Sequence, residues 1–467
     1  MSPAGALPDG PLVAFYGDDF TGASAVMEVM AFAGLQSVMF LDIPDAASLA
    51  RFPAARCIGI AGIARSQPPG WMARELPPVF AALERLGAPV IQYKICSTLD
   101  SAPHIGSIGA ALEIALPIVS RRPDVAGWQP LVVAAPAIRR YQAFGTLFAA
   151  FGAEVFRLDL HPVMRRHPVT PMDEADVRAH LSRQTAHPFA LIDLLALKSG
   201  AAQTRLNEIR AAGNAAVALD VIDEETLVAA GALIWANRAG GLFALGSQGL
   251  EYALVAHWHA AGLLPPPPTP PRPAATALLP TVSGSVSATT AEQIAWAADH
   301  GFTPIALEAA AATDPARWQV ALDTAAAEAA AALAAGRSPL VATARGPEDP
   351  AVARLAEALA RSAAEPAAVN QRIGEGLGLI LARLLRHPGI SRAAVLGGDS
   401  SGHACRALGI TALEAVAPLA PGCPLCRAHG SAAPVDGLEI ALKGGQMGPP
   451  DILGIIRAGG ATAHGST

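Results

Sequence analysis

The sequence predicts two three-layer α/β domains, each built on a mainly parallel sheet and joined by a proline-rich linker. Short aliphatic and β-branched runs recur along the whole chain, and segments of helical length separate them. The runs are apolar throughout rather than alternating with polar residues, which indicates sheets covered by helices on both faces.

The proline-rich segment 263–275, LLPPPPTPPRPAA, marks the domain boundary. Such a density of proline excludes the interior of a helix or sheet and favours an extended, semi-rigid spacer. We therefore expect an N-terminal domain over residues 1–262 and a C-terminal domain over residues 276–467.

The predicted elements follow from these runs in order. Before the linker the strands are LVAFYG, SVMFLDI, CIGIAGIA, VIQYKI, PLVVAA, FALIDLL, AVALDVI and LFALGS, and after it they are ALLPTVSGS, PIALE, PLVATA, AAVLGG and LEIALKGG. The run HACRALGITALEAV, residues 403–416, is expected to be helical. The C-x-x-C pair Cys423 and Cys426 is expected to lie in an apolar loop flanked by proline, an interpretation simpler than a zinc site with Cys405 and His429.

Composition narrows the classes of function. The chain has 467 residues, a formal net charge of −6 and 52% hydrophobic residues, without basic clusters. These values argue against nucleic acid and membrane as partners, and leave a homo-oligomer open. The start, MSPAGALPDG, lacks the pattern of a signal peptide, so we expect a cytoplasmic protein. Lysine is rare: of the 33 basic residues only three are lysines, namely Lys94, Lys198 and Lys443.

Polar residues gather after several N-terminal strands. Asp18 and Asp19 follow the first strand and precede a helical run, so one can cap the helix while the other is free to act as a general base or a magnesium-linked carboxylate. Lys94 ends an apolar strand, where it predicts either anion binding or an internal ion pair. Arg65 and Arg140 lie at two further strand ends. Because ligands gather at the carboxyl ends of parallel strands, these residues predict a binding site.

Three Gly/Ser turns end strands in the C-terminal part. Glycine lets backbone amides approach phosphate oxygens, and helix starts favour anions, so three such turns suggest a nucleotide platform. No Walker A motif is present. The candidate residues are Ser283, Ser285, Gly397, Gly398, Asp399, Ser400, Lys443, Gly444 and Gly445.

One turn also fits a different class of enzyme. Residues 398–402, GDSSG, match the G-x-S-x-G nucleophile elbow of a serine hydrolase with Ser400 as nucleophile. Asp436 and His464 follow in the order of a catalytic triad. This alternative gives the N-terminal polar cluster no role.

Taken together, the motifs resemble the four-carbon acid sugar kinase family. The resemblance rests on GDDFTGA, YKICSTLDS with GSIG, and HPVTPM before the linker, and on VSGS, GGDSSG, ALGITALE and ALKGGQMG after it. It spans nearly the whole chain in the family's order. Many relatives read closer to K-x-D-S-T-x-R-G-N where this chain has KICSTLDSA, residues 94–102.

The resemblance implies an ATP-dependent kinase that phosphorylates the terminal C4 hydroxyl of 3-oxo-tetronate, erythronate or threonate, with Mg²⁺ on the ATP phosphates. The sugar acid would bind the N-terminal domain and ATP the C-terminal one. Asp18, Asp19 and Lys94 are then the catalytic candidates, and no residue is assigned as a metal ligand. The substrate-side candidates are Arg65, Ser97, Asp100 and Arg140.

Overall fold

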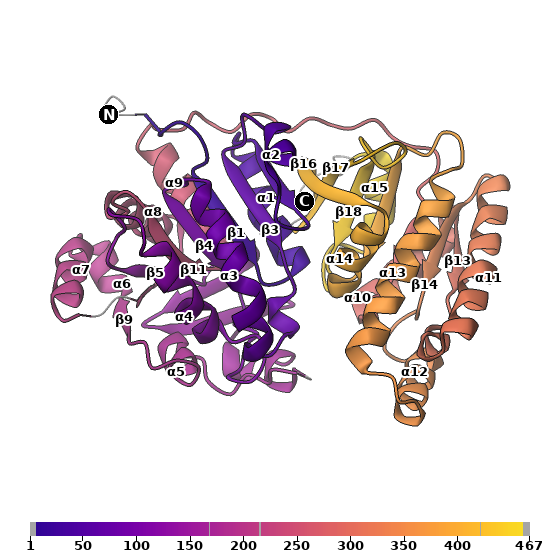
Figure 1. The fold of residues 1–467 in the computed structure, drawn as a ribbon, viewed down its shortest axis with the longest axis horizontal. Helices are drawn as coiled ribbons and strands as arrows, with labels where there is room; N and C mark the ends of the chain where they lie inside the picture. Colours follow the sequence, from indigo (N-terminus) through magenta and orange to yellow (C-terminus); the bar gives the residue numbers. More distant parts are fainter. Residues whose placement is uncertain (1–5, 168, 214–215, 421, 461–467) are drawn as a thin grey trace. The chain divides into compact units, whose positions relative to one another are not determined.

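The computed structural model describes residues 6–167, 169–213, 216–420 and 422–460. Its internal contacts divide the chain into two compact units, residues 1–268 and 269–467, and the boundary falls within the proline-rich segment. Each unit is treated by itself below (Figure 1).

Unit 1, residues 1–268, contains a parallel sheet whose strands match the predicted runs. Most of these strand residues are fully buried, because helices cover both faces of the sheet. In sheet order the strands are β2 (Ser37–Phe40), β3 (Cys57–Ala61), β1 (Val13–Gly17), β4 (Val90–Lys94), β11 (Leu242–Gly246), β5 (Gln129–Val132), β10 (Ala216–Leu219) and β9 (Phe189–Ile192).

The helices of unit 1 lie on both faces of this sheet. Helices α3 (Pro69–Arg85) and α4 (Ile108–Val119) share one core with Tyr16 and Tyr93. Helix α1 (Phe20–Phe32) packs instead with α9 (Gly249–Ala260), which contacts α8 (Glu224–Ala236). The remaining helices are α2 (Ala46–Ala50), α5 (Val177–Ser182), α6 (Leu194–Lys198) and α7 (Ala202–Ala211).

Unit 1 also carries a three-stranded antiparallel sheet that the sequence did not predict. We call it the flap: β6 (Arg140–Ala143), β7 (Thr146–Phe151) and β8 (Glu154–Arg157). Asp220, at the end of β10, accepts hydrogen bonds from the backbone N–H groups of Phe144 and Gly145 and from the Gln142 amide. These bonds fix the β6–β7 turn of the flap to the main sheet.

Unit 2, residues 269–467, has a mixed sheet. The part formed by β12, β13, β14, β15 and β18 is parallel, and β17 pairs antiparallel with both β18 and β16. In order the strands are β13 (Phe302–Ala306), β14 (Ser338–Ala342), β12 (Thr281–Ser283), β15 (Arg392–Leu396), β18 (Glu439–Lys443), β17 (Cys423–Gly430) and β16 (Ile410–Ala420).

Helices cover both faces of the unit 2 sheet as well. Helices α10 (Ala288–Asp299) and α15 (Ile452–Ala458) pack together, while α13 (Pro366–Leu384) contacts α11 (Pro315–Ala334) and α14 (Gly398–Ala407). Helix α12 (Pro350–Arg361) packs against a short 3₁₀ turn, 309–313. The predicted α/β class with mainly parallel sheets and three layers is confirmed.

Two local expectations in unit 2 were wrong. The run 403–416 is helical only to Ala407, because Gly409 adopts a left-handed φ of 80° and the β-branched Ile410 and Thr411 open strand β16. The C-x-x-C pair lies in strand β17 rather than in a loop, and the side chains of Cys423 and Cys426 are buried.

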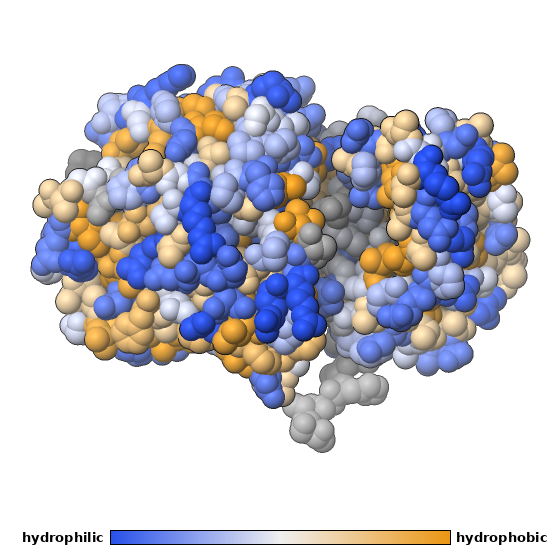
Figure 2. Space-filling view, turned by 90° about the horizontal axis from the view of Figure 1, so that it is seen from below, coloured by the Kyte–Doolittle hydropathy of each residue, from blue (hydrophilic) through white to orange (hydrophobic). Residues whose placement is uncertain are grey.

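The surface seen in Figure 2 mixes hydrophilic and hydrophobic residues within each unit. Within the described ranges, the helices are all too short or too polar to cross a bilayer.

Candidate functional site

The polar cluster of unit 1 lies at the carboxyl ends of two neighbouring strands, β1 and β4. The helices that follow these strands lie on opposite faces of the sheet. Strand β1 lies between β3 and β4, and is followed by α1 on one face. Strand β4 leads to α4 on the other face. Such a switch point leaves a crevice outside the carboxyl ends of the two strands, and ligands of open α/β sheets bind there. The residues at this crevice are Asp18 and Asp19 after β1, and Lys94 with the following turn at β4.

Two carboxylates and two cations meet at this crevice. Arg65, from the turn after β3, donates from Nη2 to Asp18 Oδ1 at 2.7 Å and to Asp19 Oδ1 at 2.6 Å. The Lys94 Nζ lies 3.7 Å from Asp19 Oδ1. The structure therefore brings together four of the predicted site residues, from three adjacent strands.

Asp19 caps helix α1, as one of the two aspartates was expected to do. Its carboxylate accepts hydrogen bonds from Gly22 N at 3.0 Å and Thr21 Oγ1 at 2.8 Å. Burial would raise the pKa of Asp19, but the charges of Arg65 and Lys94 together with these hydrogen bonds lower it to about 2. Asp19 is thus ionised across the whole physiological range.

Asp18 lies deeper and behaves differently. Its side chain is 1% exposed, and Arg65 contacts both of its oxygens. Burial raises the pKa of Asp18 above its ordinary value, against the lowering effect of the Arg65 charge. Of the two carboxylates, Asp19 at 9% exposure is the more open to a ligand.

The Lys94 ammonium is buried against the first turn of α1. It is 3% exposed, and a Cβ on Gly22 would lie 1.9 Å from Nζ, so only glycine fits there. Within the described part of the chain, Nζ makes the ion pair with Asp19 and no hydrogen bond. An ammonium has three donors, so this one retains capacity for a ligand oxygen.

A tight turn follows Lys94, and Ser97 and Asp100 belong to it. Leu99 is fully buried with φ of 53°, a left-handed conformation that is strained for leucine. Thr98 Oγ1 donates to Asp100 Oδ1 at 2.9 Å and contacts Cys96 Sγ at 3.0 Å. The half-buried carboxylate of Asp100 is thereby held at the same strand end as Lys94.

Behind Lys94 lies a third buried acid, Glu251, in the first turn of α9. The Gln92 amide donates to Glu251 Oε2 at 3.4 Å, and Oε1 has no partner among the described residues. Burial raises the pKa of Glu251 from 4.5 to about 8. Neither residue was predicted from the sequence, although a glutamine inside the apolar run VIQYKI was a visible signal.

Glu251→Gln is expected to reduce the pH dependence of stability. Because the folded-state pKa is raised, the contribution of Glu251 is fully present below pH 4.5 and is lost as the pH rises to about 8. The free energy of unfolding of the parent protein should therefore fall by roughly 2–5 kcal/mol more than that of the variant between pH 4.5 and 8.5. Denaturant unfolding at both pH values measures this, with the exposed Glu75→Gln as control; equal slopes in parent and Glu251→Gln would contradict it.

Unit 2 has a switch point of the same kind. Adjacent strands β12 and β15 are followed by α10 and α14, which lie on opposite faces of the sheet. The turns after β12, β15 and β18 meet there. A Cβ on Gly284 or on Gly397 would lie 2.6 or 2.3 Å from Ser400 Oγ, and a Cβ on Gly445 would lie 2.9 Å from Ser285 Oγ. Glycine is therefore required by this close approach, as phosphate-binding turns require it.

Lys443 holds the third of these turns from inside. The residue is fully buried, and its Nζ donates to the carbonyls of Gly444, Gly445 and Met447 at 2.9, 3.3 and 3.3 Å and to Thr290 Oγ1 at 3.2 Å. Burial lowers the pKa of Lys443 to about 8. Ser287, the N-cap of α10, also donates to Gly445 O. Ser287 and Thr290 were missed from the sequence, where the spacing Ser-x-x-Thr before a helix was the available signal.

The hydrolase alternative receives no support. Ser400 lies in the first turn of α14, in the strand–turn–helix context that the motif requires. Asp436 accepts a hydrogen bond from Gly430 N at 3.1 Å, and His464 lies outside the described residues.

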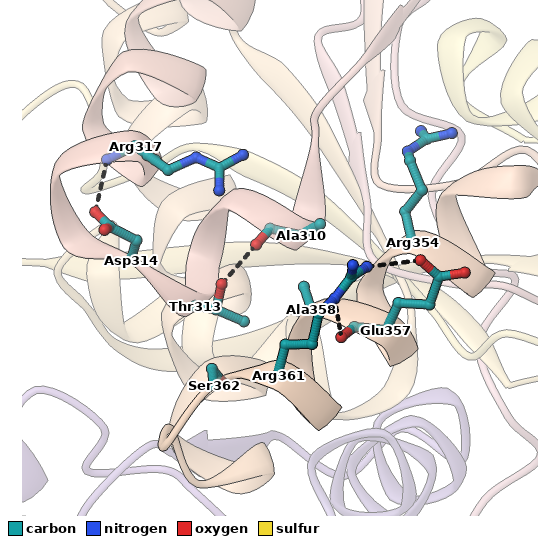
Figure 3. Close-up of a pocket in the computed structure, with 9 residues that line it drawn as sticks. All are labelled: Ala310, Thr313, Asp314, Arg317, Arg354, Glu357, Ala358, Arg361 and Ser362. Carbon is teal, nitrogen blue, oxygen red and sulfur yellow. Dashed lines mark hydrogen bonds and ion pairs between the residues drawn. The ribbon is translucent and has the colours of Figure 1, made fainter.

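A separate cavity of about 670 Å³ opens in unit 2 between the 309–313 turn and α12 (Figure 3). It is lined by charged residues, but Arg354 pairs with Glu308 and Arg361 with Glu357. None of the predicted site residues lines it.

Two family models match most of the chain. Residues 13–254 match the model of the sugar-binding N-terminal domain, and residues 281–453 match that of the nucleotide-binding C-terminal domain. A 3-oxo-isoapionate kinase from Paraburkholderia graminis is 45% identical over 98% of this chain and 96% of its own length. The chain belongs to the four-carbon acid sugar kinase family. It is an ATP-dependent sugar acid kinase, as the motifs implied.

A second relative and two solved structures align over similar lengths. A 3-oxo-tetronate kinase from Methylobacterium radiotolerans is 30% identical over 94% of this chain and 96% of its own. A crystal structure of a Salmonella typhimurium LT2 protein shares the fold with a TM-score of 0.73 at 23% identity, over 96% of this chain and 99% of that one. The Haemophilus influenzae protein HI1011 shares it with a TM-score of 0.69 at 21% identity, over 95% and 99%.

Proposed function

We propose that this kinase transfers the γ-phosphoryl group of ATP to a hydroxyl group of a 3-oxo sugar acid. The substrate is 3-oxo-isoapionate or the four-carbon 3-oxo-tetronate, the latter phosphorylated at its terminal C4 hydroxyl. The observation that carries the proposal is the switch-point crevice of unit 1, where two aspartates, Arg65 and Lys94 converge. The names of the relatives at 45% and 30% identity supply the 3-oxo acid class.

The proposed roles in unit 1 follow from burial and charge. Asp19, the more exposed carboxylate, accepts the hydrogen bond of the attacking hydroxyl and orients it. Lys94, with donors unused, binds a substrate oxygen beside it. Asp18 holds Arg65 in place. A carboxylate with a pKa of about 2 is a weak base, but phosphoryl transfer through a loose transition state depends on positioning more than on early proton removal.

In unit 2 we assign the phosphates to the three turns at the second switch point. The backbone N–H group of Gly398 and the hydroxyl groups of Ser285 and Ser400 would contact phosphate oxygens. The N–H groups of Gly284 and Gly397 donate instead to Leu396 O at 3.0 Å and to Lys443 O at 2.8 Å, and so hold the turns together. Ser283 accepts a hydrogen bond from Ser285 N at 3.3 Å and so fixes the first turn. Lys443 acts indirectly: it does not contact the phosphates but donates hydrogen bonds to the carbonyls of the turn after β18 and so holds them inward.

Mg²⁺ would neutralise charge on the ATP phosphates. Among the described residues, no group of three His, Cys, Asp or Glu side chains could hold a metal ion. This fits a magnesium ion bound mainly by phosphate and water, with one or two carboxylates at most. We assign that contact to Asp399, one of the residues that the sequence predicts for the nucleotide side.

ADP release tests the proposal. The purified enzyme with ATP and Mg²⁺ is expected to release ADP with 3-oxo-isoapionate or 3-oxo-tetronate, and at least 100-fold less efficiently with erythronate or threonate, which lack the 3-oxo group. Omission of Mg²⁺ should abolish turnover. No ADP release with either 3-oxo acid would contradict the proposal, and a preference for threonate or erythronate would contradict its substrate class.

A further inference from the structure

The flap places one arginine at the substrate crevice with part of its guanidinium unused. Arg140 is paired with Ala149 of β7, which is fully buried in the core of unit 1. Cross-strand partners share a face of the sheet, so the Arg140 side chain lies on the inner face of the flap. Its backbone pairs with that of Ala135 at 3.0 and 3.2 Å, just after β5, so Arg140 lies at the same carboxyl-terminal edge of the sheet as Lys94. The charge of Asp100, in the turn after Lys94, acts on it.

The hydrogen bonds of Arg140 leave one edge of the guanidinium open. Nη1 donates to the carbonyls of Ile138 and Arg139 at 3.2 Å and of Ala150 at 3.4 Å. Nε is buried and has no partner in the described part of the chain, and Nη2 makes neither a hydrogen bond nor an ion pair there. A buried donor without a partner costs free energy that a ligand would recover. Nε and Nη2 together form the edge that binds a carboxylate through two parallel hydrogen bonds.

The other guanidinium of the crevice, that of Arg65, is already engaged. Arg65 donates from Nε and Nη2 to the two aspartates, so its own carboxylate-binding edge is occupied. The charge of Asp100 acts on both Arg65 and Arg140, yet within the described residues it forms no ion pair with either. Arg140 is therefore the guanidinium of the crevice whose carboxylate-binding edge is open to a ligand.

We propose that Arg140 binds the carboxylate of the sugar acid, while the hydroxyl to be phosphorylated lies at Asp19 and Lys94. This rests on the proposed function and adds the orientation of the substrate along the strand ends. It makes Arg140 the residue that selects an acid over the corresponding neutral sugar. The flap then serves to carry this arginine, with Asp220 fixing its turn.

The test compares an acid with its neutral counterpart. For 3-oxo-tetronate this is erythrulose, which has CH₂OH in place of the carboxylate and keeps the hydroxyl group next to the ketone. In Arg140→Met, kcat/KM for the acid is expected to fall about 100-fold, mainly through KM, while kcat/KM for erythrulose changes less than about 3-fold. Arg140→Lys, which keeps the charge without the two-donor edge, should recover only part of the loss.

Arg165→Met is the matched control, since it removes a positive charge from an exposed position in the loop after the flap. It should leave the preference for the acid unchanged. An equal loss for acid and ketose in Arg140→Met would show that the arginine only stabilises the flap, and would overturn the inference. An unchanged preference of Arg140→Met for the acid over erythrulose would also overturn the inference. If the parent enzyme turns over neither 3-oxo acid, the proposed function fails and not this assignment alone.

Discussion

Asp19→Asn is expected to lower kcat about 10³-fold while the protein stays folded. Asparagine is as good an N-cap as aspartate, so the hydrogen bond from Gly22 N can be kept. The negative charge that orients the hydroxyl and pairs with Arg65 and Lys94 is lost. Removal of a positioned acid–base group typically costs 10²–10⁴ in rate. Steady-state ADP release with saturating ATP and sugar acid measures the effect.

The control for capping is Asp45→Asn, which changes the equivalent N-cap of α2 on the surface. Its kcat should be unchanged. The pH profile separates the two aspartates, because the pKa of Asp19 is about 2 whereas burial raises that of Asp18. With Asp19 as the working carboxylate, kcat should stay flat down to about pH 4. An acid limb at higher pH that disappears in Asp18→Asn, or full turnover in folded Asp19→Asn, would move the role to Asp18.

The strands of both sheets could be predicted because they are buried on both faces, which makes them continuous apolar runs. The flap has no such signature: its inner face carries Arg140 and Gln142 and its outer face Tyr141 and Phe148, so apolar and polar residues do not separate. The start of strand β16 has the composition of a helix, because alanine, leucine and glutamate dominate it. Gly409 was the stop signal that outweighed this composition.

The site was predictable as a set of strand ends, but not as a set of contacts. Asp18, Arg65 and Lys94 are far apart in sequence and meet because β1 pairs with β3 on one side and with β4 on the other. That order cannot be derived from local pattern. The open edge of Arg140 is likewise a tertiary property, since it depends on which carbonyls reach Nη1.

The three lysines offer the second large effect. Arginine predominates among the 33 basic residues, so a lysine is expected where a compact ammonium is required and a guanidinium does not fit. The structure gives them different surroundings. Lys198 pairs with Asp223 and Glu225 at the surface, Lys94 lies under α1, and Lys443 is fully buried inside the third turn.

Lys443→Arg is therefore expected to raise the KM for ATP about 100-fold, because a guanidinium does not fit a fully buried ammonium site and displaces the carbonyls of the turn. The KM for the sugar acid should stay within about 3-fold. Lys94→Arg should show the opposite pattern, with a loss of about 100-fold in kcat/KM for the acid. Lys198 forms an exposed ion pair of small energetic value, so the Lys198→Arg variant should behave as the parent enzyme.

Lys443→Met distinguishes the reason for the effect. Methionine fills a similar volume without the donors, so it should also raise the KM for ATP if the hydrogen bonds to the turn matter. Thermal unfolding of each variant shows whether the fold is kept. If Lys94→Arg and Lys443→Arg both retain full activity, the rarity of lysine reflects only codon preference, and the ammonium groups have no special role at either switch point.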